Sequence, residues 1–255
     1  MRWSLLLFPF LAVACAGTGG HRPEAAPPPA FSVHTYGRAA TKSWVFVPAA
    51  PPRLVVLFVH GLGNTRETTP YYHRPWLAHL AREGYEVVYP AYETYPYQQG
   101  GLKHLVQGIA AAMPRLARGV PVAAIGYSRG GRLVVDYASI ASVTGLVPGR
   151  VVSVFPSGSM DALMNLSPLV GHTKVLILAG DKDTTVGTVG AGQLVTQLAA
   201  SGFPYGDVRF EAVHSHGSFV ADHLSVLSDT PAARTAYWAR ADRFLAPLAL
   251  RTGAS

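Results

Sequence analysis

The sequence contains a single cysteine, Cys15, so no disulfide bond can form within the chain. Charged residues are also scarce, at 14%, whereas hydrophobic residues make up 49%. This composition excludes a globally disordered chain and is sufficient for a large buried core. A length of 255 residues is typical of one domain with a short appended segment.

Runs of basic residues are missing, although the formal net charge is +7. The 21 lysine and arginine residues are scattered along the sequence. A protein that binds nucleic acid normally concentrates its positive charge on one face or in one segment. The charge distribution therefore predicts no nucleic-acid partner.

The N-terminus has the pattern of an export signal. Arg2 is followed by an apolar stretch over residues 3–14 that is too short to span a bilayer comfortably. The small residues at 12–14 directly precede Cys15, and this arrangement resembles a bacterial lipoprotein signal. The resemblance implies a lipid on Cys15 and attachment to a membrane. The alternative is an ordinary cleaved signal in which Cys15 has no role.

The expected organisation of the chain follows from this signal. Residues 1–14 are predicted to be a signal peptide, and residues 15–30, rich in glycine and proline, a disordered tether. The folded domain is expected over residues 31–250, with a short tail at 251–255. The sequence thus predicts an exported protein, located in the cell envelope or secreted.

Strands and helices are expected to alternate through the domain. The apolar run at 54–59 is typical of a strand buried on both faces of a parallel sheet. Strands are predicted at 32–36, 44–48, 54–59, 85–89, 120–126, 151–155, 174–179 and 208–213, and helices at 75–83, 102–117, 130–142, 190–201 and 231–248. The first two strands suggest an antiparallel hairpin, and Pro114 should kink or end its helix. The prediction is an α/β fold with a mostly parallel sheet covered by helices on both faces.

The most specific motif is Gly126-Tyr127-Ser128-Arg129-Gly130, which fits G-x-S-x-G. It lies between a predicted strand and a predicted helix, the context that such a nucleophile motif requires. Glycines on both sides allow a sharp turn that exposes the Ser128 hydroxyl above the sheet. The sequence therefore predicts Ser128 as a catalytic nucleophile.

A second glycine-containing turn, His60-Gly61-Leu62-Gly63, follows the predicted strand at 54–59. Acyl transfer needs two hydrogen-bond donors directed at the developing oxyanion. The backbone N–H groups of Leu62 and Arg129 are the predicted pair. His60 is expected to brace this loop.

The carboxylate of a triad is expected after the nucleophile, at the end of a later strand. Asp181 and Asp183 both follow the strand at 174–179. Asp183 is preferred because it lies further into the loop, whereas Asp181 is better placed to order the turn. Asp161, after the preceding strand, remains a third possibility.

The catalytic base is expected last, in the loop after the strand at 208–213. His216 is preferred because the flexible Gly217 follows it, and His214 is the second choice. His223 is interpreted as structural. A metal site formed by these three histidines is a weaker reading beside the serine motif, so no metal or cofactor is predicted.

The order His60-Gly61, Ser128, Asp183, His216 resembles the α/β-hydrolase superfamily, over nearly all of residues 31–250. The resemblance implies an α/β-hydrolase fold and a Ser-His-Asp acyl-enzyme mechanism on small-molecule or lipid carboxylic esters. Within the superfamily, the segments at 76–81 and 89–92 resemble the corresponding segments of esterases, lipases or dienelactone hydrolases that have only a small cap. The short spacing between the strands ending near 155 and starting at 174 predicts no large lid, and a serine nucleophile argues against a true dienelactone hydrolase.

The substrate pocket and reaction leave alternatives open. Tyrosines in the loops on the expected active-site side could line a pocket or could cover the sheet edge, as could two methionines; they are Tyr71, Tyr72, Tyr92, Tyr95, Tyr97, Met160 and Met164. The same triad could instead serve a peptidase or amidase. A non-catalytic surface-binding lipoprotein is the alternative outside the enzymes.

Overall fold

The computed structural model describes residues 30–62, 66, 68–95, 98–158 and 164–250. Several of the sequence predictions lie outside these residues; they are the signal peptide, Cys15, the tether up to residue 29, Tyr97, Met160, Asp161 and the tail. Among the described residues, no helix is both long enough and apolar enough to cross a membrane.

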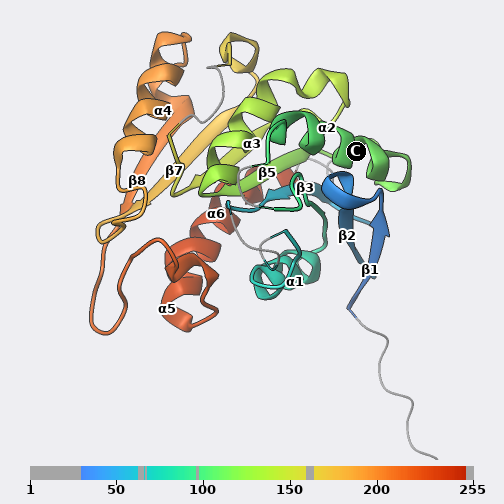
Figure 1. The fold of residues 1–255 in the computed structure, drawn as a ribbon, viewed down its shortest axis with the longest axis horizontal. Helices are drawn as coiled ribbons and strands as arrows, with labels where there is room; N and C mark the ends of the chain where they lie inside the picture. The colour runs from blue at the N-terminus through green and yellow to red at the C-terminus, as the bar shows by residue number, and fades with distance from the viewer. Residues whose placement is uncertain (1–29, 63–65, 67, 96–97, 159–163, 251–255) are drawn as a thin grey trace, which may run out of the picture.

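An eight-stranded sheet forms the centre of the molecule, with the strand order β1-β2-β4-β3-β5-β6-β7-β8 (Figure 1). The strands are β1 (Phe31–Tyr36), β2 (Ser43–Pro48), β3 (Leu54–Val59), β4 (Tyr85–Pro90), β5 (Val122–Tyr127), β6 (Arg150–Val154), β7 (Lys174–Gly180) and β8 (Val208–Val213). β1 pairs antiparallel with β2, which confirms the predicted hairpin, and β2 pairs antiparallel with β4. All other pairs are parallel, so the sheet is mostly parallel as predicted.

Helices connect the parallel strands, as crossover connections require, except between β6 and β7, where the described residues contain only the 3-10 turn Ser167–Leu169. They are α1 (Arg74–Arg82), α2 (Gly101–Ala112), α3 (Arg129–Ile140), α4 (Val189–Ala200), α5 (Pro231–Ala233) and α6 (Ala239–Ala249), with a π-helical turn (Arg234–Trp238) between the last two. Pro114 ends α2 as expected, because it lies in the 3-10 turn Met113–Arg115 that directly follows this helix. The closing helix is less regular than predicted, since the π-helical turn interrupts it.

The helices form two layers, one on each face of the sheet (Figure 1). Alternate side chains of β3 supply both cores: Val56 and Phe58 pack with residues of α1 and α6, whereas Val55 and Leu57 pack with residues of α2, α3 and α4. This alternation explains why β3 is an unbroken apolar run. Because β3 to β8 run parallel, their carboxyl ends lie at one edge of the sheet, which is where ligands of such folds bind.

Candidate active site

Ser128 occupies a strained turn between β5 and α3. Its backbone has φ 56° and ψ −123°. Residues other than glycine rarely adopt this conformation, and it costs about 1–3 kcal/mol of conformational free energy. The Ser128 N–H donates to the Val154 carbonyl at 2.9 Å, and the Ser128 carbonyl accepts from the Ser157 N–H at 3.1 Å. These bonds to the neighbouring strand and loop hold the serine in place.

The two motif glycines are required by close backbone contacts. A Cβ atom at Gly126 would lie 2.1 Å from the Gly130 carbonyl oxygen, and a Cβ atom at Gly130 would lie 2.1 Å from the His60 carbonyl oxygen. Neither backbone atom can move without shifting a strand or a helix. Glycine at these two positions therefore allows the turn that presents the Ser128 side chain.

A chain of two side-chain hydrogen bonds links Ser128 to Asp183 through His223. The Nε2 atom of His223 lies 2.9 Å from the Ser128 Oγ atom, and its Nδ1 atom lies 2.9 Å from the Asp183 Oδ2 atom. All three residues are buried. Because a carboxylate only accepts hydrogen bonds, Nδ1 carries a proton, and Nε2 of the neutral ring is then free to accept the serine proton.

Asp183 is held by the loop that follows β7. Its Oδ1 atom accepts the backbone N–H groups of Thr185 at 2.8 Å and Val186 at 3.1 Å, which leaves Oδ2 directed at His223. Asp181 serves the loop after β8 instead, because its carboxylate accepts both the N–H and the hydroxyl of Ser215. Donation by the Ser215 hydroxyl lowers the pKa of the Asp181 carboxyl.

The predicted base, His216, is not in this hydrogen-bond chain, and the structure puts His223 in its place. His216 is exposed, and its backbone pairs with Phe219 in a tight turn. His214 is also exposed, with its Nδ1 atom 3.7 Å from Asp181. This geometry contradicts the preference for His216, and it places His223, which the sequence analysis interprets as structural, within hydrogen-bond distance of Ser128 and Asp183.

The strand order explains why His216 lies too far from Ser128. β8 is separated from β5 by β6 and β7, a lateral distance of about 14 Å at about 4.8 Å per strand. A histidine three residues after β8, held in a turn, does not cover that distance. The chain turns at 216–219 and runs back over the sheet, where the His223 carbonyl accepts the Tyr127 hydroxyl at 2.9 Å and the ring lies against Phe155. The length of the loop, rather than a neighbouring glycine, was the available signal.

The loop after β3 lies directly against the serine. A Cβ atom at Gly61 would be 3.1 Å from the Ser128 Cβ atom, and the half-buried Leu62 follows. The hydroxyl of Tyr92 donates to the carbonyls of His60 and Gly61 at 2.9 and 3.1 Å. The His60 ring stacks on Tyr92 with ring centres 4.2 Å apart, so His60 braces this loop, as its position predicts.

Arg129, the residue after the serine, forms a buried ion pair with Glu93. Its Nη1 atom lies 2.7 Å from the Glu93 Oε2 atom, and its guanidinium lies over the Tyr92 ring. The side chain is thereby directed at the loop after β4, while the backbone N–H of Arg129 begins helix α3. The first N–H groups of a helix have no partner within the helix, so this one is available at the serine.

The other residues that were predicted to line a pocket differ in their burial and contacts. Tyr92 is fully buried and serves the brace just described, whereas Tyr71 and Tyr95 are exposed. Tyr71 and Tyr72 contact each other edge to face. Met164 packs against the core beside α4, so it is core filler in this structure.

The strand order and the helices on both faces of the sheet are those of the α/β-hydrolase fold. The strained serine follows β5, the aspartate follows β7 and the histidine follows β8. Among solved structures, the chain is similar to esterase B from Lactobacillus rhamnosis with a tributyrin phosphonate, with a TM-score of 0.64 and 16% identity over 88% of each chain. Carboxyl esterase 2 from the mycorrhizal fungus Tuber melanosporum matches with a TM-score of 0.64 and 17% identity, over 89% of this chain and 90% of that chain. A putative dienelactone hydrolase from Klebsiella pneumoniae matches with a TM-score of 0.55 and 15% identity, over 84% and 99%.

No protein-family model matches the chain, and no curated protein does. At identities of 15–17%, these structural similarities establish the fold alone. The chemistry must therefore be argued from the residues of the site.

Proposed function

We propose that this protein is a serine hydrolase that cleaves carboxylic esters through an acyl-enzyme on Ser128. The observation that carries the proposal is the pair of 2.9 Å contacts that join Ser128, His223 and Asp183 in one line. A serine hydroxyl is a weak nucleophile unless a base removes its proton, and a correctly oriented neutral histidine is such a base.

In the first half of the proposed reaction, the Ser128 Oγ atom attacks the ester carbonyl carbon while His223 Nε2 takes the hydroxyl proton. Asp183 keeps the Nδ1 proton of His223 in place and stabilises the imidazolium that forms. The backbone N–H groups of Leu62 and Arg129 are proposed to bind the oxyanion. The tetrahedral intermediate collapses, the C–O bond to the alcohol breaks, and His223 returns the proton to the leaving alcohol.

In the second half, a water molecule attacks the acyl carbonyl and gives one proton to His223. The bond between the acyl carbon and Ser128 then breaks, and the serine oxygen regains this proton as the carboxylic acid leaves. The same two backbone N–H groups serve both tetrahedral intermediates. No cofactor or metal takes part in this proposal.

Labelling of the full chain with a fluorophosphonate probe tests the proposal. Wild type and His216→Ala should be labelled, whereas Ser128→Ala and His223→Ala should not. Wild type that has not been treated with the probe should release p-nitrophenol from p-nitrophenyl butyrate with a burst equal to the enzyme concentration, as acyl-enzyme accumulation predicts, and prior labelling should abolish this burst. Folded wild type without labelling or burst would overturn the proposal in favour of a non-catalytic binding protein.

The proposal for export rests on the sequence alone. We propose that residues 1–14 direct secretion and that a lipid on Cys15 anchors the protein to a membrane. Mass spectrometry of the mature protein made in a bacterial host tests both, with Cys15→Ser as the control. An unmodified mature N-terminus before or after Cys15 would contradict the lipid anchor.

A further inference from the structure

The outer edge of β8 leaves a row of backbone groups facing away from the sheet. β8 is the terminal strand of the sheet order, and Arg209, Phe210 and Ala212 are exposed. The Val213 carbonyl accepts the Asp181 N–H at 3.0 Å, so Val213 bonds towards β7. Because the direction of these groups alternates along a strand, those of Val208, Phe210 and Ala212 point outwards.

Several of the devices that protect an edge strand, namely proline, lysine and a bulge, are missing from β8, although it carries the charged residues Arg209 and Glu211. Its sequence, VRFEAV, contains no proline and no lysine, and the six-residue ladder with β7 has no bulge. Such an edge is a template for pairing with another strand. The Ala212 carbonyl is contacted only at 3.4 Å by the Arg240 guanidinium, a weak interaction that pairing can replace.

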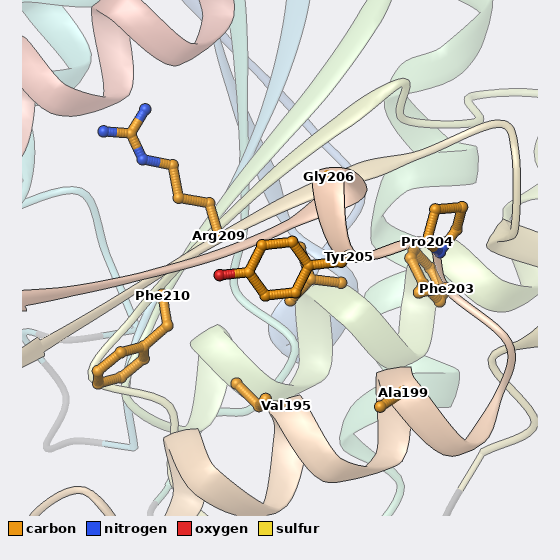
Figure 2. Close-up of a pocket in the computed structure, with 9 residues that line it drawn as sticks. Val195, Ala199, Phe203, Pro204, Tyr205, Gly206, Arg209 and Phe210 are labelled. Carbon is orange, nitrogen blue, oxygen red and sulfur yellow. The ribbon is translucent and has the colours of Figure 1, made fainter.

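An apolar hollow lies beside this edge, between β8 and α4 (Figure 2). It has a volume of about 560 Å³ and is lined by Val195, Ala199, Phe203, Pro204, Tyr205, Gly206, Val208, Arg209 and Phe210. Tyr205 is 98% exposed and Phe210 is 47% exposed, which is unusual for two large aromatic side chains so close together. Figure 2 shows Phe210 on the side of α4 and Arg209 pointing the opposite way.

The charges of β8 are complementary to those of a second, antiparallel copy of β8. In an antiparallel pair, directly opposed residues lie on the same face, so the twofold axis between two identical strands passes through a residue position. An axis at Arg209 opposes two arginines, and an axis at Glu211 opposes two glutamates. An axis at Phe210 instead opposes Arg209 to the partner's Glu211, twice, and pairs the two Phe210 rings.

We propose that two copies of this chain associate by antiparallel pairing of β8 about a twofold axis at Phe210. In this register the outward-facing backbone groups of Phe210 meet those of the partner's Phe210. Those of Val208 meet those of the partner's Ala212, and each such pair exchanges two hydrogen bonds. The two sheets join into one, and the apolar hollow of each copy faces its partner.

Glu211 is the critical charge of this interface. It contacts Arg209 at 2.6 Å and Arg240 at 3.6 Å within one copy. It is also the only acidic residue in the hollow formed with Arg150, Leu176, Arg209, Arg240, Arg243 and Phe244. Reversing its charge should therefore leave only like charges across the axis.

Sedimentation velocity of the full chain across the micromolar range tests the proposal. Wild type should form a dimer, whereas Arg209→Glu and Glu211→Arg should each raise the dissociation constant at least tenfold, because each opposes like charges. An equimolar mixture of the two variants should form heterodimers, since Glu at 209 then meets Arg at 211 in both directions. Arg118→Glu makes the same charge change on an exposed loop remote from β8 and should leave the dimer intact.

Three outcomes would overturn the proposal. Wild type could remain monomeric, both charge variants could dimerise like wild type, or the mixture could stay monomeric. Circular dichroism melts of each variant separate loss of pairing from loss of folding. Phe210→Pro gives a second check, because it removes an outward N–H without touching the bonds to β7, and it should abolish the dimer.

Discussion

The turn that carries Ser128 and the loop that carries His223 bring two halves of one site together by different means. The serine turn, residues 126–130, depends on close backbone contacts that only glycine permits: Gly126 meets the Gly130 carbonyl within the turn, and Gly130 meets the His60 carbonyl just after the neighbouring strand β3. The histidine loop, residues 214–223, is determined by residues far away in sequence. Its carbonyl at 223 is held by Tyr127, and its ring is held by Asp183.

This difference explains why one half was predicted and the other was misassigned. A backbone contact that only glycine permits leaves a sequence motif, whether its partner lies four residues away, as for Gly126, or at the end of another strand, as for Gly130. A loop that must cross two strands leaves only a length, and several histidines within it satisfy the same local pattern. The two regions should consequently respond differently to substitution.

The largest effect should come from the histidine itself. His223→Ala should lower kcat for p-nitrophenyl butyrate by roughly 10⁶-fold, since members of a triad act as a unit. His216→Ala should leave kcat almost unchanged, because its ring contacts Phe219 and not the serine. Steady-state measurement of kcat for the two purified variants shows which histidine is the base. A greater loss in His216→Ala would return the role of base to that residue.

The second effect concerns the orientation of the His223 ring. Asp183→Asn should lower kcat by roughly 10⁴-fold, because an amide can donate to Nδ1 and so stabilise the wrong tautomer. Asp181→Asn is the matched control, since Asp181 contacts Ser215 and His214 rather than His223. Equal losses of kcat in the two variants would contradict the assignment of Asp183.

The third effect compares one glycine from each region. Gly130→Ala should lower the free energy of unfolding by about 3 kcal/mol, because its Cβ would overlap the carbonyls of Val59 and His60. Gly217→Ala meets no atom within 4 Å and has only its φ of 53° to accommodate, so it should cost about 1 kcal/mol. Urea unfolding of both variants measures the difference. Equal costs would mean that the serine turn has room to relax.

The smallest effect lies outside both regions, at the contact between α1 and α6. The Asp242 carboxylate, 2.9 Å from His79 Nε2, raises the pKa of His79 above 6.5. A raised pKa in the folded state means that this stabilisation is complete below pH 6.5 and is lost as the pH rises through the raised value. The contribution should stay below about 1 kcal/mol, since both side chains are partly exposed.

Comparison of wild type with His79→Gln checks this pH dependence. Thermal melts at pH 5.5 and pH 8.5 should show a larger difference between the two proteins at the lower pH. A difference that grows towards higher pH would contradict the raised pKa. Residues of the serine turn are not involved, so the pH dependence of folding and that of catalysis can be separated.

Much of the fold followed from the sequence because its elements have strong periodic signals. The buried strand at 54–59 and the helix beginning near Pro75 were predicted to within about two residues. Proline at 114 marked the end of α2. The π-helical turn at 234–238 left no such signal, because its residues are compatible with an ordinary helix.

The residues of the site also differ in whether the sequence predicts them. Ser128, the turn at His60-Gly61 and the preference for Asp183 over Asp181 could be read from the sequence, since each directly follows a recognisable strand. The choice among three histidines, the ion pair of Arg129 with Glu93 and the open edge of β8 could not. Each of these depends on which strands lie side by side and how far apart they are, and strand order is a property of the folded chain. The sequence by itself determined that Ser128 lies in a glycine-flanked turn after a buried strand, whereas the tertiary structure decided which histidine lies within hydrogen-bond distance of it.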